Sequence, residues 1–288
     1  TNCIGMYYTK TNTMYSFVLR NPENPQIEVL EKDMKSNFQK YYKMFTDFIK
    51  FDLGSDEKIE KYGLKNIKLS VGFFDTEQLH PDFAMAYNMA YDMPQLIARL
   101  QVNGLNPKDV ICDKEFDPKF CSYYVDEKNI NMLEERCDFA DISSYTTYLD
   151  QMILYISRRK GQHATDSYSL DTIGGYECGV KKLDYHDITT NIAKFPYLDF
   201  KRFWLYNMID VIVQVCLEAQ TGDLKYVFNN VIEMNTPYQK IFRQTVYLAA
   251  KGADFYKNHE GVIMGENVNK FGTKPDEKFA GAFVADPL

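Results

Sequence analysis

The segment from Lys201 to Leu217 constrains the fold most, because it contains neither glycine nor proline and carries bulky apolar residues at helical spacing. We predict a helix here. Tyr206 and Asp210 are four residues apart, so they share one face of that helix. A carboxylate on an apolar helix is costly unless it is exposed, paired or bound to a metal ion. Asp210 is therefore either a surface residue at the rim of a core helix, or part of a site where the Tyr206 hydroxyl positions a water molecule or a phosphate.

Composition indicates a folded globular protein with one large domain or two modest ones: 288 residues, 45% hydrophobic, with 22 Tyr and 20 Phe. The net charge of -7 argues against a generic nucleic-acid coat protein. It does not exclude nucleic acid as a substrate, because a carboxylate-rich site for divalent cations is itself acidic. The six cysteines form no Cys-x-x-Cys pair, which argues against structural zinc and a disulfide framework. We expect a cytoplasmic protein with reduced cysteines and neither a signal peptide nor a membrane span.

Hydrophobic patterns predict an alternation of strands and helices along the chain. Expected strands cover residues 3–8 and 13–19 as a hairpin, then 67–74, 83–87, 121–125 and 139–142. Expected helices cover residues 27–51, 144–159, 169–176 and 201–217, followed by a helical stretch that breaks at Pro237 and resumes over 238–255. Residues 54–66 are expected to form a polar loop. The basic end of the 144–159 helix, at Arg158 and Arg159, is expected to be solvated.

A second polar stretch, Asn88-x-x-Tyr91-Asp92, is followed by Pro94. We predict that a strand ends near Asn88 and that a helix begins at Pro94, because proline suits the first helical position. Asp92 then lies at the junction between them. Its side chain either points into a cleft or acts as an ordinary helix N-cap.

These stretches resemble the exonuclease motifs of family B DNA polymerases. Asn88-x-x-Tyr91-Asp92 with Pro94 resembles the second motif. Tyr206-x-x-x-Asp210 resembles the third, in a form close to that of T4-like phage polymerases.

Three further segments agree with this resemblance. Residues 167–171 (Ser-Tyr-Ser-Leu-Asp) and 179–185 resemble the connecting helix and loop, and residues 281–287 resemble the segment that enters the polymerase palm. Each motif alone is weak evidence, but all of them occur in the family's order and spacing across nearly the whole chain.

The resemblance implies an α/β fold, the RNase H-like exonuclease fold, with a mixed sheet flanked by helices. Residues 1–222 would form the 3′–5′ exonuclease domain, with its opening strand missing. Residues 223–288 would form a helical segment and an extended tail leading toward the N-terminal and palm regions. The implied activity is proofreading, the hydrolysis of the 3′-terminal phosphodiester of DNA with two metal ions.

The resemblance also implies roles for five residues. Asp92 and Asp210 would be catalytic metal ligands for two Mg²⁺ (or Mn²⁺) ions, which prefer carboxylate and water oxygens. Tyr206 would orient the attacking water, while Asn88 and Tyr91 would place the frayed DNA strand.

The implied partners are a single-stranded 3′ end of DNA and the rest of the polymerase (palm, fingers and thumb). A sliding clamp is a further candidate partner, and no membrane is involved. A phage-encoded protein would act in the host cytoplasm. Two nearby aromatic side chains, Tyr87 and Phe203, are expected to pack in the core rather than stack on bases.

The chain departs from the family pattern at the first motif, Asp-x-Glu, which normally precedes the hairpin. We expect this motif upstream of Thr1. Asp75-Thr76-Glu77 has the right composition, but it follows the long helix and is otherwise the exposed end of a strand. Polymerase catalytic motifs are absent from the sequence, so we do not expect this chain to extend a primer.

Three hypotheses stay open. The chain is the exonuclease portion of a family B polymerase, a non-catalytic module for DNA binding or docking that keeps a degenerate exonuclease fold, or a free-standing exonuclease that uses Asp75 and Glu77. Two carboxylates do not easily hold two divalent ions, so the activity of the chain by itself depends on where the first motif lies.

Overall fold

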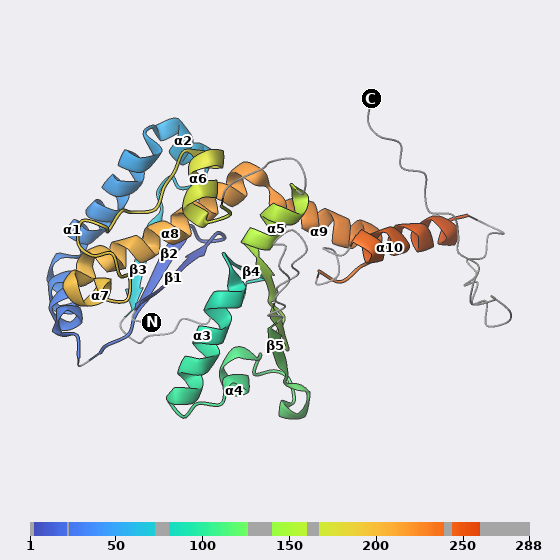
Figure 1. Ribbon diagram of the computed structural model, residues 1–288, viewed down its shortest axis with the longest axis horizontal. Coiled ribbons are helices and arrows are strands. Elements are labelled where there is room, and N and C mark those ends of the chain that lie inside the picture. The colour runs from blue at the N-terminus through green and yellow to red at the C-terminus, as the bar shows by residue number, and fades with distance from the viewer. Residues whose placement is uncertain are drawn as a thin grey trace, which may run out of the picture.

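A three-stranded mixed sheet lies beneath the longest helices of the computed structural model (Figure 1), which describes residues 3–21, 23–72, 81–125, 140–159, 167–238 and 244–259. Strands β1 (Cys3–Tyr8) and β2 (Thr13–Val18) form the predicted antiparallel hairpin, with Cys3 opposite Val18. Strand β3 (Lys68–Gly72) pairs parallel to β2, so the strand order is β1-β2-β3. The crossover from β2 to β3 consists of two helices, α1 (Pro25–Leu53) and α2 (Asp56–Lys61).

Helix α1 confirms the helix predicted over residues 27–51, and one face of it is buried, including Leu30, Met34, Tyr41 and Phe45. The prediction of a loop over residues 54–66 is wrong, because it contains α2. The Ser55 hydroxyl caps this helix by accepting the N–H of Lys58, and acidic residues occupy its first turn. Capping therefore outweighs the polar composition that suggested a loop.

A second group of strands lies below α5 in Figure 1. Strand β4 (Phe83–Ala86) pairs parallel to β7 (Thr147–Asp150), and β5 (Tyr123–Val125) pairs antiparallel to β6 (Ala140–Ile142). Helices α3 (Met89–Val102) and α4 (Pro107–Ile111) and a short 3₁₀ turn (Pro118–Phe120) accompany these strands.

Two sequence predictions fail in this region. The helix expected over residues 144–159 is instead β7 followed by α5 (Gln151–Arg158), because pairing with β4 decides the conformation of β7. The helix expected to begin at Pro94 begins at Met89, with Pro94 inside it. Asp92 therefore lies near the start of α3, neither at a strand-to-helix junction nor at the N-cap, which is Asn88.

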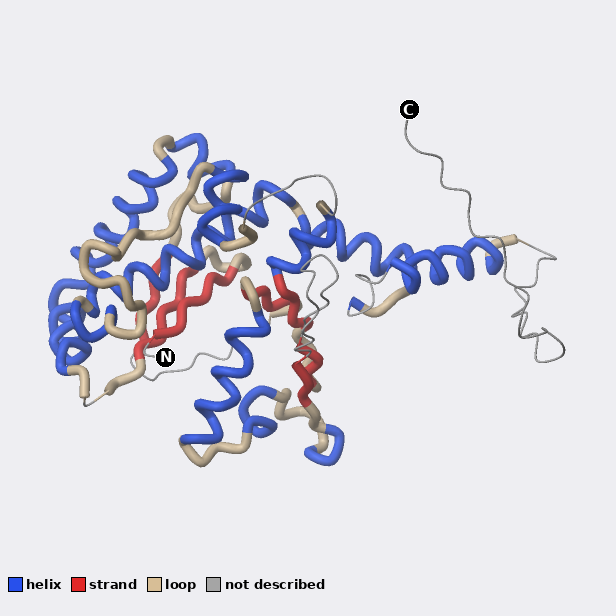
Figure 2. Tube along the Cα trace, viewed as in Figure 1, coloured by secondary structure: helices blue, strands red, loops and turns tan. Residues whose placement is uncertain are grey.

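The remaining helices are α6 (Leu170–Cys178), α7 (Phe195–Leu198), α8 (Phe200–Thr221), α9 (Asp223–Met234) and α10 (Gln244–Lys257). Helix α8 confirms the predicted central helix and packs against α1, α6, α7 and β1. Its buried side chains, including Trp204, Met208 and Val213, lie in the largest core cluster. The tube in Figure 2 shows α9 and α10 extending beyond the sheets.

The described residues therefore form a mixed α/β structure of small sheets flanked by helices. The predicted break near Pro237 is confirmed, since α9 ends at Met234 with Asn235 in the left-handed conformation. Within the described part of the chain, we find no helix whose length and apolar character would let it span a bilayer.

Candidate functional site

Helix α8 places Asp210 beside a lysine that lies 28 residues earlier in the chain. The Lys182 ammonium donates a 3.1 Å hydrogen bond to Oδ2 of Asp210, and these two side chains are 29% and 21% exposed, respectively. The other carboxylate oxygen, Oδ1, is buried and has no hydrogen-bond partner in the described residues. Asp210 is therefore partly buried and paired rather than fully exposed, and one of its acceptor oxygens is left unused.

Burial raises the pKa of Asp210 from its ordinary value of 3.8 to about 6. The Lys182 ammonium and the neighbouring Tyr206 hydroxyl lower this pKa, while the negative charge of Asp171 adds to the increase. Since a pKa of about 6 still lies below neutrality, the carboxylate is mostly ionised at pH 7. Asp210 can therefore accept hydrogen bonds or bind a cation.

Lys182 is held by its backbone as well as by its side chain. The Lys182 N–H donates a 2.8 Å hydrogen bond to Oδ1 of Asp171, which lies in the first turn of α6. Helix α6 approaches α8 closely because Gly174 has no side chain, and a Cβ built there would lie 2.5 Å from Cγ1 of Val213. This close packing fixes the loop that brings Lys182 to Asp210.

Tyr206 is buried one turn before Asp210. Its ring meets those of Tyr185 and Phe195 edge to face, with centroid distances of 5.5 and 5.9 Å, and the Lys182 ammonium lies 5.7 Å from its centroid. Burial, followed by the charge of Asp210, raises the pKa of the Tyr206 phenol well above 10. At neutral pH the hydroxyl keeps its proton, so it can hold a water molecule but does not act as a base.

Asp92 is solvent-exposed near the start of α3. Desolvation by the surrounding protein atoms nevertheless raises the pKa of its carboxyl, and the charge of Lys182 lowers it. Lys182 therefore acts electrostatically on both carboxylates that the sequence predicted as site residues. No group of three or more His, Cys, Asp or Glu side chains within the described ranges is placed to hold a metal ion.

The two predicted substrate-binding residues also lie at the start of α3. Asn88 is half-buried in the left-handed conformation (φ 64°), and its side chain makes no capping hydrogen bond. Tyr91 is 65% exposed, so its ring is accessible beside Asp92. The two other aromatic residues confirm the core-packing prediction: Tyr87 and Phe203 pack against the main core, and the Tyr87 hydroxyl donates to the Tyr168 carbonyl.

Sequence reasoning missed two residues of this region. Lys182 belongs to the 179–185 segment that was noted only as a loop. Asp150 was placed inside a helix, whereas it ends β7, where its buried carboxylate accepts four backbone N–H groups. An aspartate directly before an apolar run is a helix N-cap signal that predicts part of this role.

The structure contradicts one further prediction, the solvated helix end at Arg158 and Arg159, and does not describe the residues of two others. The basic pair Arg158 and Arg159 is not a solvated helix end, because both guanidinium groups form ion pairs with the buried carboxylate of Asp223. The Asp75-Thr76-Glu77 stretch and residues 281–287 lie outside the described residues, so their roles stay predictions.

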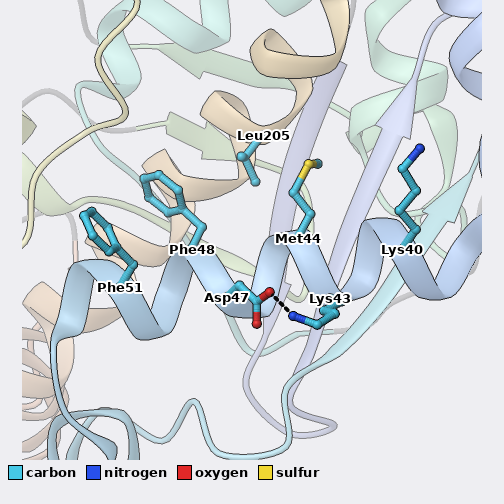
Figure 3. A pocket seen from close by; sticks show the side chains of 7 residues that line it. All are labelled: Lys40, Lys43, Met44, Asp47, Phe48, Phe51 and Leu205. Carbon is cyan, nitrogen blue, oxygen red and sulfur yellow. Dashed lines mark hydrogen bonds and ion pairs between the residues drawn. The ribbon is translucent and has the colours of Figure 1, made fainter.

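An open pocket lies on another part of the surface, between α1 and α8. Figure 3 shows the residues that line it: Lys40, Lys43, Met44, Asp47, Phe48, Phe51 and Leu205. Its paired charges are Lys43 and Asp47, joined by the dashed line. None of the predicted site residues lines this pocket, so we place the candidate site at Asp210 and Lys182 instead.

Comparison with known proteins adds no assignment to this site. No protein-family model matches the sequence, and no curated protein matches it either.

Proposed function

We propose that this chain is the 3′–5′ exonuclease portion of a family B DNA polymerase, with an RNase H-like fold. It would hydrolyse the 3′-terminal phosphodiester of DNA. The chemistry of the site and the order of the motifs support this proposal.

The carrying observation is the ion pair between Lys182 and the largely buried carboxylate of Asp210 on α8, whose Oδ1 has no hydrogen-bond partner among the described residues. The charge of Lys182 also lowers the pKa of Asp92 on α3. Lys182 and Asp210 come from separate parts of the chain, so their pairing does not follow from sequence spacing. A site that gathers carboxylates around a cation suits the handling of a phosphodiester and divalent metal ions.

Asp92 and Asp210 would hold Mg²⁺ or Mn²⁺. The unpartnered Oδ1 of Asp210 fits this role, because a buried acceptor without a hydrogen bond is costly unless it finds a ligand. Two ions need more ligands than these two carboxylates supply, and the first motif would provide them. When bound, the ions would supply electrostatic stabilisation of the attacking and leaving oxygens.

The other residues would orient the reactants. The protonated Tyr206 hydroxyl would hold the attacking water next to Asp210. Tyr91, whose ring is exposed, would stack on a base of the frayed strand, and the Asn88 amide would hydrogen-bond to it. The Lys182 ammonium would offset the negative charge of the phosphodiester in a site that is otherwise acidic.

The alternative is a non-catalytic DNA-binding or docking module. The Lys182–Asp210 ion pair favours it in one respect, because a lysine that permanently neutralises the carboxylate would replace a metal ion. The third hypothesis, a free-standing exonuclease that uses Asp75 and Glu77, makes a distinct prediction about those two residues.

A 3′-end degradation assay on labelled single-stranded DNA separates the three hypotheses. The chain is assayed with Mg²⁺ and with Mn²⁺, alongside Asp92→Asn, Asp210→Asn and Asp75→Asn. A matched control is Asp47→Asn, which removes an exposed carboxylate that pairs with Lys43.

Metal-dependent activity that is lost with Asp92 or Asp210, and kept with Asp47→Asn, supports the proposal. Additional loss with Asp75→Asn supports the free-standing exonuclease. If the protein stays inactive even when an upstream Asp-x-Glu segment is supplied, the exonuclease proposal fails and the non-catalytic module is favoured.

A further inference from the structure

A single buried carboxylate connects the first turns of two helices in this structure. Asp150 ends β7 and is 1% exposed. Its Oδ1 accepts the backbone N–H groups of Met152 and Ile153, at 2.9 and 3.3 Å, and so caps α5 in the usual way. The same carboxylate also accepts the N–H of Asn88, through Oδ1 at 3.2 Å, and the N–H of Met89, through Oδ2 at 2.7 Å.

The first turn of α3 is capped by the side chain of Asp150 and not by that of its own N-cap residue. This N-cap residue, Asn88, is in the left-handed conformation, and its side chain makes no capping hydrogen bond. The first N–H groups of a helix have no partner within the helix, and leaving them unpaired in a buried place is costly. The parallel pairing of β4 with β7 sets Ala86 opposite Asp150, so both strands end next to this carboxylate.

We propose that Asp150 is a positioning residue for the candidate site, because it fixes the first turn of α3, which carries Asn88, Tyr91 and Asp92. This inference rests on the proposed exonuclease function. Asp150 would not touch substrate or metal ion. It would act through the backbone at Met89, three residues before Asp92, and so set where the Asp92 carboxylate lies relative to Asp210.

The Asp150→Asn variant separates the two capping roles. Its amide offers one acceptor oxygen, which best occupies the Oδ1 position because three of the four N–H groups point there. The amide NH₂ then faces the Met89 N–H, so two donors meet and that hydrogen bond is lost. We therefore expect α5 to keep its cap while the first turn of α3 loosens.

Hydrogen–deuterium exchange on the full chain tests this without relying on catalysis. In Asp150→Asn, amides in residues 88–92 should exchange roughly tenfold faster, while those in residues 152–156 should keep their protection. Ser55→Ala is the matched control, since it removes the cap of α2 and leaves every site residue in place. If the amide variant does not fold, Asp150→Ser keeps a good cap for α5 and repeats the test.

Nuclease kinetics supply the second measurement. A displacement of about 1 Å at a reacting group lowers the rate by on the order of a hundredfold, so kcat should fall by roughly ten- to a hundredfold in Asp150→Asn and stay unchanged in Ser55→Ala. Exchange that rises equally in both helices, or in neither, overturns the proposal. So does an unchanged kcat in a variant whose α3 amides have lost protection. If the wild-type chain stays inactive even when an upstream Asp-x-Glu segment is supplied, the exonuclease function fails, and the exchange pattern alone decides whether Asp150 fixes α3.

Discussion

Two adjacent glycines in α6 should respond in opposite directions to the same substitution. Gly174 faces α8, where an added Cβ would lie 2.5 Å from Cγ1 of Val213 and 3.0 Å from the carbonyl oxygen of Val180. Gly175 faces the flexible side chain of Lys181, whose nearest atoms would lie 3.5 and 3.7 Å away, an ordinary contact. The two sites share one helix, so the difference between them isolates the packing against α8.

The magnitude follows from these distances. Carbon atoms pack best at about 3.5–4.0 Å, so Gly174→Ala requires the helices to separate by about 1 Å. The fully buried Val213 cannot move aside, because a β-branched side chain in a helix has one strongly preferred rotamer. Overpacking of this kind costs ~1–3 kcal/mol, while the better helix propensity of alanine returns at most ~1 kcal/mol. We expect Gly174→Ala to lower the free energy of unfolding by ~1–2 kcal/mol, and Gly175→Ala to raise it by up to ~1 kcal/mol.

Urea unfolding followed by tryptophan fluorescence measures both effects. Trp204 is the single tryptophan of the chain and is completely buried on α8, so its emission reports the loss of this core. The combined variant Gly174→Ala/Val213→Ala should be more stable than the sum of the two single losses predicts, because removing the Val213 methyl groups relieves the clash. If Gly174→Ala is as stable as the wild type, or if both glycine variants shift equally, the close contact between α6 and α8 is refuted.

Two further predictions concern the buried charges where α8 meets α9. Burial, followed by the charge of Asp223, raises the pKa of Glu218 from 4.5 to about 7, so its contribution to stability is complete below pH 4.5 and is lost as the pH rises through about 7. Glu218→Gln should therefore be more stable than wild type above pH 7, by up to ~3 kcal/mol, and equal to it near pH 4. Urea midpoints measured at both pH values check this, and a difference between the two proteins that is the same at both would contradict it. Asp223→Asn should destabilise the fold by ~2–3 kcal/mol, because Arg158 and Arg159 lose their carboxylate partner, and an unchanged urea midpoint would show that the two pairs contribute nothing.

Local sequence patterns predicted the long helices and the first hairpin well. Helix α8 and helix α1 have apolar residues at helical spacing over many turns, and the hairpin has two β-rich runs around a short polar turn. Strand β7 was missed because its four residues adopt a strand only by pairing with β4, more than sixty residues earlier in the sequence. The start of α3 was misplaced for a related reason, since its cap comes from Asp150, 62 residues away from Asn88.

At the site too, the sequence predicted what depends on local spacing and missed what depends on long-range packing. The shared face of Tyr206 and Asp210 follows from a spacing of four residues on one helix. The partner of Asp210 does not, because Lys182 reaches it only after Gly174 lets α6 pack closely on α8. Long-range packing thus decides which charge faces the predicted carboxylate, and single-sequence patterns carry little information about such contacts.

The charge balance of the site bears on the proposed need for a divalent cation. Lys182 interacts with three carboxylates: its ammonium pairs with Asp210 and lowers the pKa of Asp92, and its backbone N–H donates to Asp171. When all are ionised, negative charge exceeds positive charge by two. Burial is the largest cause of the raised pKa values of Asp92 and Asp210, and Lys182 offsets it only partly. A bound divalent cation would neutralise the excess and favour ionisation of both groups, so we expect cation binding to release protons and to tighten as the pH rises through about 6.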